Sequence, residues 1–281
     1  MAIGDSTRIN TNIAAFNALN ALKSINRALE KSQLRLATGL RINEVADDPA
    51  GFVISNRLRA RIVGLTTAFD NVGTAKNVLS IAEGGLLNIS DIIITIKEKV
   101  TQAASDTLGS AERNAIKTEI DQLTAEIDDI VGETLFNNIA LIDGTYTGIS
   151  LQTGEGTTNT LIISISGDHT ANGLTLASGS VSSRVFTATG ASIALSNVNA
   201  ALETINNSLQ GIGAKISRLT VKEGTLSIAI TNTKAAKSRI LDADIAQEQL
   251  HSTRLQILQQ IATAQLAQAN VSPQNVLALF T

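Results

Sequence analysis

The feature that most constrains the fold is one long, narrow apolar stripe between Leu58 and Val100. Apolar side chains recur there every three or four residues, and only at Phe69, Val72 and Ala75 do two intervals of three follow each other. This spacing predicts one amphipathic helix of about 43 residues, about 65 Å long at 1.5 Å per residue. The stripe consists of Leu58, Ile62, Leu65, Phe69, Val72, Ala75, Leu79, Ala82, Leu86, Ile89, Ile93, Ile96 and Val100.

The start of this helix is also indicated by the sequence. Asp47 and Asp48 precede Pro49, which is the order of a capping carboxylate followed by a proline at the first helical position.

Two further stripes have the same spacing. One runs from Ile116 to Ile130 and follows a polar stretch at 104–110 that we interpret as a turn. The other runs from Leu195 to Ile230, with Glu223 as the single charged residue at the expected spacing. Stripes this narrow have to be covered by neighbours, so we expect the three helices to pack lengthwise. The predicted fold class is mainly α: an elongated coiled-coil helical bundle, shaped as a rod.

Residues 132–190 differ from the rest of the chain. They contain nine of the twenty glycines, and their apolar spacing drops to two: Leu161, Ile163 and Ile165 alternate with other residues. Alternation preceded by a glycine-rich turn is typical of a half-buried strand. We expect a small β-hairpin segment with a few antiparallel strands.

The two chain ends carry helical stripes of their own, which we take as candidate self-assembly residues. Up to Arg41 the first has a net charge of +4, whereas the segment from Ile240 has −2. We therefore expect the terminal helices to pair as an inner coiled coil. The candidate residues are Leu22, Ile25, Leu29 and Leu36 near one end and Leu250, Ile257, Leu258, Ile261 and Leu266 near the other.

A two-helix pair with apolar positions off its main stripe leaves apolar surface uncovered in a monomer. Such surface is usually covered by other copies or other proteins. Two alternatives remain open from the residues alone. The chain could close on itself as a bundle of four or five helices, or its ends could stay disordered until assembly.

Several function classes are disfavoured. Aromatic residues make up only 2% of the chain, although enzymes use them to line pockets. A net charge of −3 gives no basic surface for nucleic acid. The chain contains no run of about 18 apolar residues, which is the pattern that would predict a membrane-spanning helix. The first ten residues lack the apolar stretch of a secretory signal, so leaving the cell would need a dedicated route.

The sequence predicts no catalytic residue, cofactor or metal site. It contains no cysteine, and its two histidines, His169 and His251, have no partner at metal-ligand spacing. We predict both to be solvated surface histidines. The acidic pairs Asp128-Asp129 and Asp242-Ala243-Asp244 are interpreted as a polar helix face and a helix N-cap, respectively.

Both chain ends resemble bacterial flagellin. In residues 9–65 the motifs are Gly39-Leu40-Arg41-Ile42-Asn43, Asp47-Asp48, Ala50-Gly51 and Ile54-Ser55. In residues 238–280 they are Gln256-Ile257-Leu258-Gln259-Gln260, Leu266-Ala267-Gln268-Ala269-Asn270 and Pro273-Gln274-Asn275-Val276-Leu277. The resemblance is weaker along the long helices and covers about three quarters of the chain. Pro49 departs from the alanine expected there, which a first helical position tolerates.

The resemblance implies an extracellular subunit of the flagellar filament that forms a homopolymer. It implies export through the flagellar type III apparatus and assembly under a cap, with hook-junction proteins and an export chaperone as further partners. It also implies terminal segments 1–42 and 237–281 in an inner core, rod halves at 43–131 and 191–236, and the β-rich segment at 132–190. Because only residues 132–190 lie between the two helical halves, the chain resembles a minimal flagellin.

Flagellins also offer a surface to an innate immune receptor of the Toll-like class. By resemblance, the receptor-facing arginine and leucine fall on Thr95 and Lys99, and the acidic position falls on Glu119. Two of these three positions depart from the stimulating pattern, so we expect weak receptor activation.

Two alternative functions stay open at this point. One is the homologous adapter at the hook-filament junction, and the other is a secreted coiled-coil binding module. Residues 256–277 favour the filament subunit, because junction proteins match that segment less well.

Overall fold

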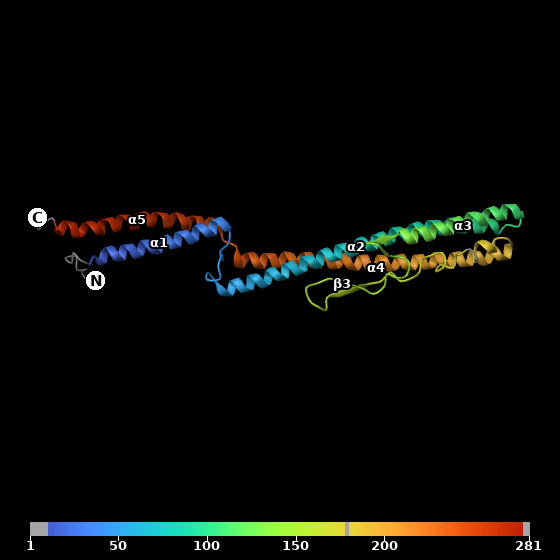
Figure 1. Ribbon diagram of the computed structural model, residues 1–281, viewed down its shortest axis with the longest axis horizontal. Helices are drawn as coiled ribbons and strands as arrows, with labels where there is room; N and C mark the ends of the chain where they lie inside the picture. Colours follow the sequence, from blue (N-terminus) through green and yellow to red (C-terminus); the bar gives the residue numbers. More distant parts are fainter. Residues whose placement is uncertain (1–10, 178–179, 278–281) are drawn as a thin grey trace. The chain divides into compact units, whose positions relative to one another are not determined.

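The computed structural model describes residues 11–177 and 180–277, with side chains up to residue 271. The chain divides into two compact units. The first combines residues 1–60 with 232–281, and the second is residues 61–231. In chain order the elements are α1 (Ile13–Thr38), α2 (Pro49–Ala103), α3 (Ser110–Glu133), β1 (Leu135–Phe136), β2 (Ile139–Ala140), β3 (Ile149–Gln152), β4 (Thr160–Ile163), the 3-10 turn η1 (Ser182–Arg184), α4 (Ala188–Leu241) and α5 (Ile245–Leu277), as Figure 1 shows.

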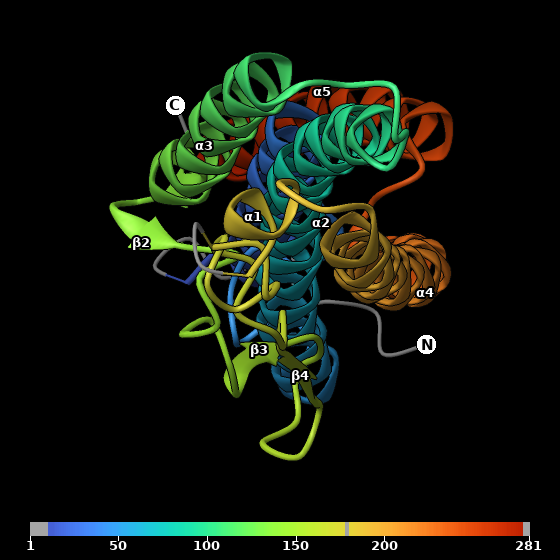
Figure 2. The same ribbon diagram turned by 90° about the vertical axis from the view of Figure 1, so that its right-hand side faces the viewer.

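The second unit is a helical bundle, as its spacing predicts. Within it α3 and α4 both run alongside α2 (Figures 1 and 2). The predicted stripe of α2 forms the core: Leu79, Leu86 and Ile93 are fully buried and meet Ile120 of α3 and Ile205 of α4 in one apolar cluster. Each such side chain contributes about 1.5–3 kcal/mol when fully buried. The helix starts at Pro49 as predicted, and the Asp48 carboxylate accepts a hydrogen bond from the Gly51 amide at 2.9 Å.

Length and composition alone would also let α2 cross a membrane. Its apolar stripe is instead covered by protein: Leu86, Ile89 and Val100 expose none of their surface. We therefore interpret α2 as the core helix of this bundle.

Glu223, the charged residue on the stripe of α4, has a partner that the sequence could not show. Its carboxylate lies 2.7 Å from the Lys76 ammonium of α2, and both side chains are about one third exposed. An ion pair at the edge of the bundle thus satisfies the one charge that interrupts the apolar spacing.

The predicted β segment consists of two separate antiparallel pairs. β1 pairs with β2 through a tight turn at Asn137 and Asn138, whose φ angles of 49° and 65° suit a two-residue hairpin. β3 pairs with β4, with Ile149 opposite Ile163. The strand expected over Leu161–Ile165 ends at Ile163, although Ile165 is buried as the alternation indicates. Much of 132–190 is irregular.

Candidate assembly surface

In the first unit α1 and α5 lie side by side and run in opposite directions (Figure 1). The Asn12 amide donates to the Ala269 carbonyl at 2.7 Å, and the Gln259 amide donates to the Asn26 side-chain oxygen at 2.8 Å. Further along, the Arg35 guanidinium lies 3.7 Å from the Glu248 carboxylate. The predicted pairing of the terminal helices is therefore confirmed.

The connections at one end of this pair fix its register. Gly39 ends α1 with a φ of 71°, a left-handed conformation that suits glycine, and its amide donates to the Arg35 carbonyl. The Arg41 amide then donates to the Leu241 carbonyl at 2.7 Å, and the Ala243 amide donates to the Gly39 carbonyl at 2.9 Å. The predicted cap of α5 is present, because Asp244 accepts hydrogen bonds from the amides of Ala246 and Gln247.

Asp47 holds the loop between α1 and α2 against α1. Its carboxylate lies 2.5 Å from the Lys31 ammonium and accepts hydrogen bonds from the amides of Asn43 and Glu44. The hydrogen bond from Lys31 is the main reason that the pKa of Asp47 falls to about 2, with the Asn43 amide second. The carboxylate therefore remains charged throughout the neutral and mildly acidic range.

The structure divides the candidate assembly residues between two faces of the pair. Leu29 is buried between the helices together with Leu255 and Ala262 of α5. Leu22, Ile25, Leu36, Leu258 and Leu266 are half-buried. In contrast, Leu250, Ile257 and Ile261 expose 74%, 53% and 47% of their surface. In α5, then, Leu255 and Ala262 lie on the side that faces α1, and Leu250, Ile257 and Ile261 face outward.

Three of the outward positions share one side of α5. Leu250, Ile257 and Ile261 are seven and four residues apart, which places them on one side of a helix. Val271, further along α5, is 42% exposed. On α1, Ile13 and Phe16 are also exposed, by 55% and 64%. An apolar face of this extent is suited to contact with another protein surface.

Thr95, Lys99 and Glu119, which the resemblance assigns to a receptor surface, lie in the second unit, on α2 and α3. The Lys99 ammonium lies 2.6 Å from the Glu119 carboxylate, and the Thr95 hydroxyl donates to the Asp91 carbonyl. Glu119 is therefore paired with Lys99 across α2 and α3.

His169 corrects one prediction: it is fully buried and not a solvated surface residue. One ring nitrogen, Nδ1, lies 2.9 Å from the Ile142 carbonyl, and the other, Nε2, lies 2.8 Å from the Ser208 hydroxyl. Because a carbonyl can only accept, the neutral ring donates from Nδ1 and accepts from Ser208. The irregular segment folds back onto α4 and covers the ring, which local spacing could not reveal. His251 is exposed as predicted.

We expect His169 to make the second unit less stable in acid. Burial lowers its pKa below the ordinary value of 6.5, even though the Ile142 carbonyl and Asp168 act to raise it. The unfolded chain therefore takes up the proton first as pH falls, so the contribution to stability is complete above about pH 6.5 and is lost below it. Urea unfolding followed by circular dichroism between pH 8 and 5 should show this loss, and His169→Gln should flatten the slope. His251→Gln is the control and should keep the parent slope; equal slopes for all three chains would contradict the prediction.

Arg113 was missed by sequence reasoning. It exposes only 6% of its surface, although it is a charged residue at the start of α3. Its guanidinium donates to the carbonyls of Ala103, Ser105 and Val185, and its Nε donates to Leu108. Arg113 therefore fastens the end of α2, the turn before α3 and the segment before α4 to one another.

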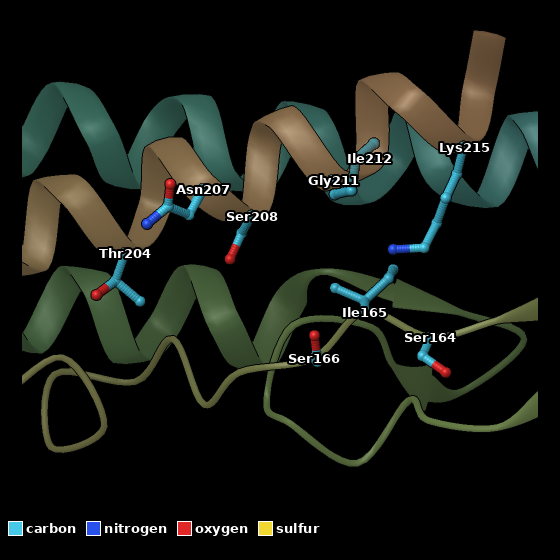
Figure 3. A pocket seen from close by; sticks show the side chains of 9 residues that line it. All are labelled: Ser164, Ile165, Ser166, Thr204, Asn207, Ser208, Gly211, Ile212 and Lys215. Atoms are coloured by element: carbon cyan, nitrogen blue, oxygen red, sulfur yellow. The ribbon is translucent and has the colours of Figure 1, made fainter.

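Two surface hollows lie beside α4. One of about 300 Å³ is lined by Ser164, Ser166, Thr204, Ser208 and Lys215, among others. Figure 3 shows Ser208 and Lys215 of α4 pointing toward the segment that carries Ile165 and Ser166. Across the described part of the chain, no group of three or more histidine, aspartate or glutamate side chains is placed to hold a metal ion.

Paired terminal helices and a three-helix bundle define a mainly α-helical class of protein. Comparisons with known sequences are more specific. Residues 9–147 match the bacterial flagellin N-terminal helical region, and residues 195–280 match the bacterial flagellin C-terminal helical region. The chain belongs to the bacterial flagellin family.

Individual relatives match along nearly the whole chain. Flagellin of Bacillus subtilis is 34% identical, over 97% of this chain and 99% of the relative. The flagellar filament 33 kDa core protein of Treponema phagedenis is 32% identical over the same shares of both chains. Among solved structures, a protein of Vibrio parahaemolyticus assigned as flagellar hook-associated aligns with a TM-score of 0.60 at 14% identity, over 70% of this chain and all of its own. That last likeness concerns the fold alone.

Proposed function

We infer that this chain is the structural subunit of a bacterial flagellar filament and polymerises with copies of itself for motility. The observation that carries this function is the match along 97% of the chain to proteins named flagellin and flagellar filament core protein. The outward apolar face of α5 supports it physically, because a polymer would cover that face. Neither the junction adapter nor the secreted binding module has comparable support.

The polymer requires two different surfaces on each copy. When such a contact is repeated with a rotation that does not close, it generates an open helical filament. We propose that residues 1–42 and 237–281 form the inner core of that filament and that its outward face includes Leu250, Ile257 and Ile261. The segments 43–131 and 191–236 would form the surrounding layer, and 132–190 a small elaboration on it.

The remaining partners are proposed from family membership. They are the type III export apparatus, an export chaperone on the C-terminal segment, a cap at the growing tip and hook-junction proteins. The location that follows is extracellular, in the filament. A structural role also implies that the chain is not an enzyme.

Polymerisation of the purified full chain tests the function directly. After addition of salt and short filament seeds, negative-stain electron microscopy should show long tubes of uniform diameter. If only monomers persist where a control flagellin polymerises, the chain is not a self-sufficient filament subunit.

We also propose that recognition by a Toll-like receptor is weak. Thr95 and Lys99 depart from the stimulating residues, and Lys99 neutralises Glu119 at 2.6 Å. In a cell reporter assay we expect low potency for the parent chain and a higher potency for Thr95→Arg with Lys99→Leu. Lys97→Leu, two residues away, is the control and should leave potency low. Parent potency equal to that of a stimulating flagellin would refute the proposal.

A further inference from the structure

A basic stripe runs along α4. Lys215, Arg218 and Lys222 are spaced by three and four residues, so they share one side of the helix. Within residues 11–177 and 180–277 no ion pair involves any of the three, and the only acidic residue among 204–233, Glu223, is paired with Lys76. The stripe is therefore a local concentration of three positive charges.

An acidic stripe with the same spacing lies on α3. Glu126, Asp129 and Glu133 are again three and four residues apart, and all three are exposed. The described residues provide no ion pair for them either, and no basic residue occurs between Glu126 and Glu133. The neighbouring Asp128 already has a partner within the chain, because its carboxylate accepts a hydrogen bond from the Ala171 amide at 2.7 Å.

The surroundings of the basic stripe suit carboxylates. Lys215 lines the hollow of Figure 3, together with several hydroxyl side chains. Arg218 and Lys222 line a second hollow of about 390 Å³ with Thr153, Thr158 and Thr160. No acidic side chain lines either hollow. Both therefore present hydrogen-bond donors and positive charge.

Each stripe also adjoins exposed apolar residues. Val221 and Ile228 on α4 expose 70% and 64% of their surface. Leu135 and Ile139, which follow the acidic stripe in the chain, expose 41% and 48%. Protein interfaces combine an apolar centre with a polar rim, and complementary charges fix their register. The acidic and the basic stripe each combine charged side chains with exposed apolar side chains nearby.

We propose that the acidic stripe of one copy, Glu126, Asp129 and Glu133, docks on the basic stripe of a neighbouring copy, Lys215, Arg218 and Lys222. The partner is a second copy of this chain, because the two stripes match in charge, in number and in spacing. The contact joins two different surfaces, as an open polymer requires. This inference rests on the proposed function and assigns one of its lateral contacts.

Charge reversal in the full chain tests the contact. The measurement is the critical concentration for seeded polymerisation at low ionic strength, where exposed charges are least screened. We expect K215E/R218E/K222E and, separately, E126K/D129K/E133K to raise it about tenfold or more, because each puts like charges in contact. The chain with all six changes should return to within about threefold of the parent, as expected for directly coupled sites.

Three controls separate contact from net charge and from misfolding. K215R/R218K/K222R keeps the charges and should polymerise like the parent. K215E/R218E/K222E combined with D70K/D91K/E98K restores the net charge of −3 through other exposed acidic residues of α2, and it should stay impaired. Thermal unfolding of each monomer should match the parent, because neither stripe forms ion pairs within the described chain.

Each outcome has a distinct meaning. If the parent chain fails to polymerise, the proposed function fails. If the parent polymerises but the reversals do not impair it, only the docking of the stripes is overturned, and the basic stripe would serve another partner. If K215E/R218E/K222E with D70K/D91K/E98K polymerises as well as the chain with all six stripe changes, the effect is one of net charge. That result would also overturn the proposed contact.

Discussion

Replacing Leu250, Ile257 and Ile261 together by serine is expected to abolish polymerisation at concentrations where the parent chain forms filaments. These side chains are 74%, 53% and 47% exposed in the monomer, so a covering copy would gain their burial. Full burial of such a side chain is worth about 1.5–3 kcal/mol, and at least about 1 kcal/mol each remains to be gained here. The critical concentration should therefore rise at least about a hundredfold. Sedimentation of seeded polymer measures this rise.

The serine variant should keep its fold, because the three side chains point away from α1. Circular dichroism of the monomer should match the parent. Leu255→Ser is the matched comparison: Leu255 exposes only 7% of its surface, on the side of α5 that contacts α1. It should loosen the α1–α5 pair, which amide hydrogen exchange would detect. Gln256→Ser with Gln260→Ser changes exposed polar positions of the same helix and should leave both properties unchanged. Filaments of the triple variant at parent concentrations would show that this face is not covered in the polymer.

Replacing Arg113 by alanine is expected to destabilise the second unit strongly. The guanidinium donates to four backbone carbonyls, and those of Ala103 and Val185 belong to residues that expose none of their surface. Leaving buried acceptors without donors costs about 1–3 kcal/mol for each group. We expect the free energy of unfolding to fall by about 2–4 kcal/mol and the melting temperature by about 5–15 °C, a range typical of a unit of this size.

Two comparisons show whether the network causes this loss. Arg113→Lys keeps the charge but cannot donate in four directions, so it should lie between alanine and the parent. Arg184→Ala removes an exposed arginine at the end of η1 and should change the melting temperature by less than about 2 °C. Similar losses for the two alanine variants would mean that the four carbonyls are satisfied without the guanidinium.

The sequence by itself determined the helices, because helical periodicity and capping are local properties. The stripe from Leu58 to Val100 predicts the buried face of α2, and Asp48 with Pro49 marks its start. Asp244 likewise marks the start of α5. Glycine content and alternation located the hairpin segment, and the charges of the ends favoured their pairing. Apart from the charges of the two ends, these signals depend on residues close to one another in the chain.

Only the tertiary structure decided which side of α5 contacts α1 and which faces outward. Both sides are apolar, so spacing cannot rank them, and the choice depends on residues more than two hundred positions away. The same reason applies to His169, which is buried because an irregular segment folds onto α4, and to Arg113, whose four carbonyls come from three separate parts of the chain. Burial and pairing are properties of segments brought together in space, and a local pattern can only indicate which side chains are available for them.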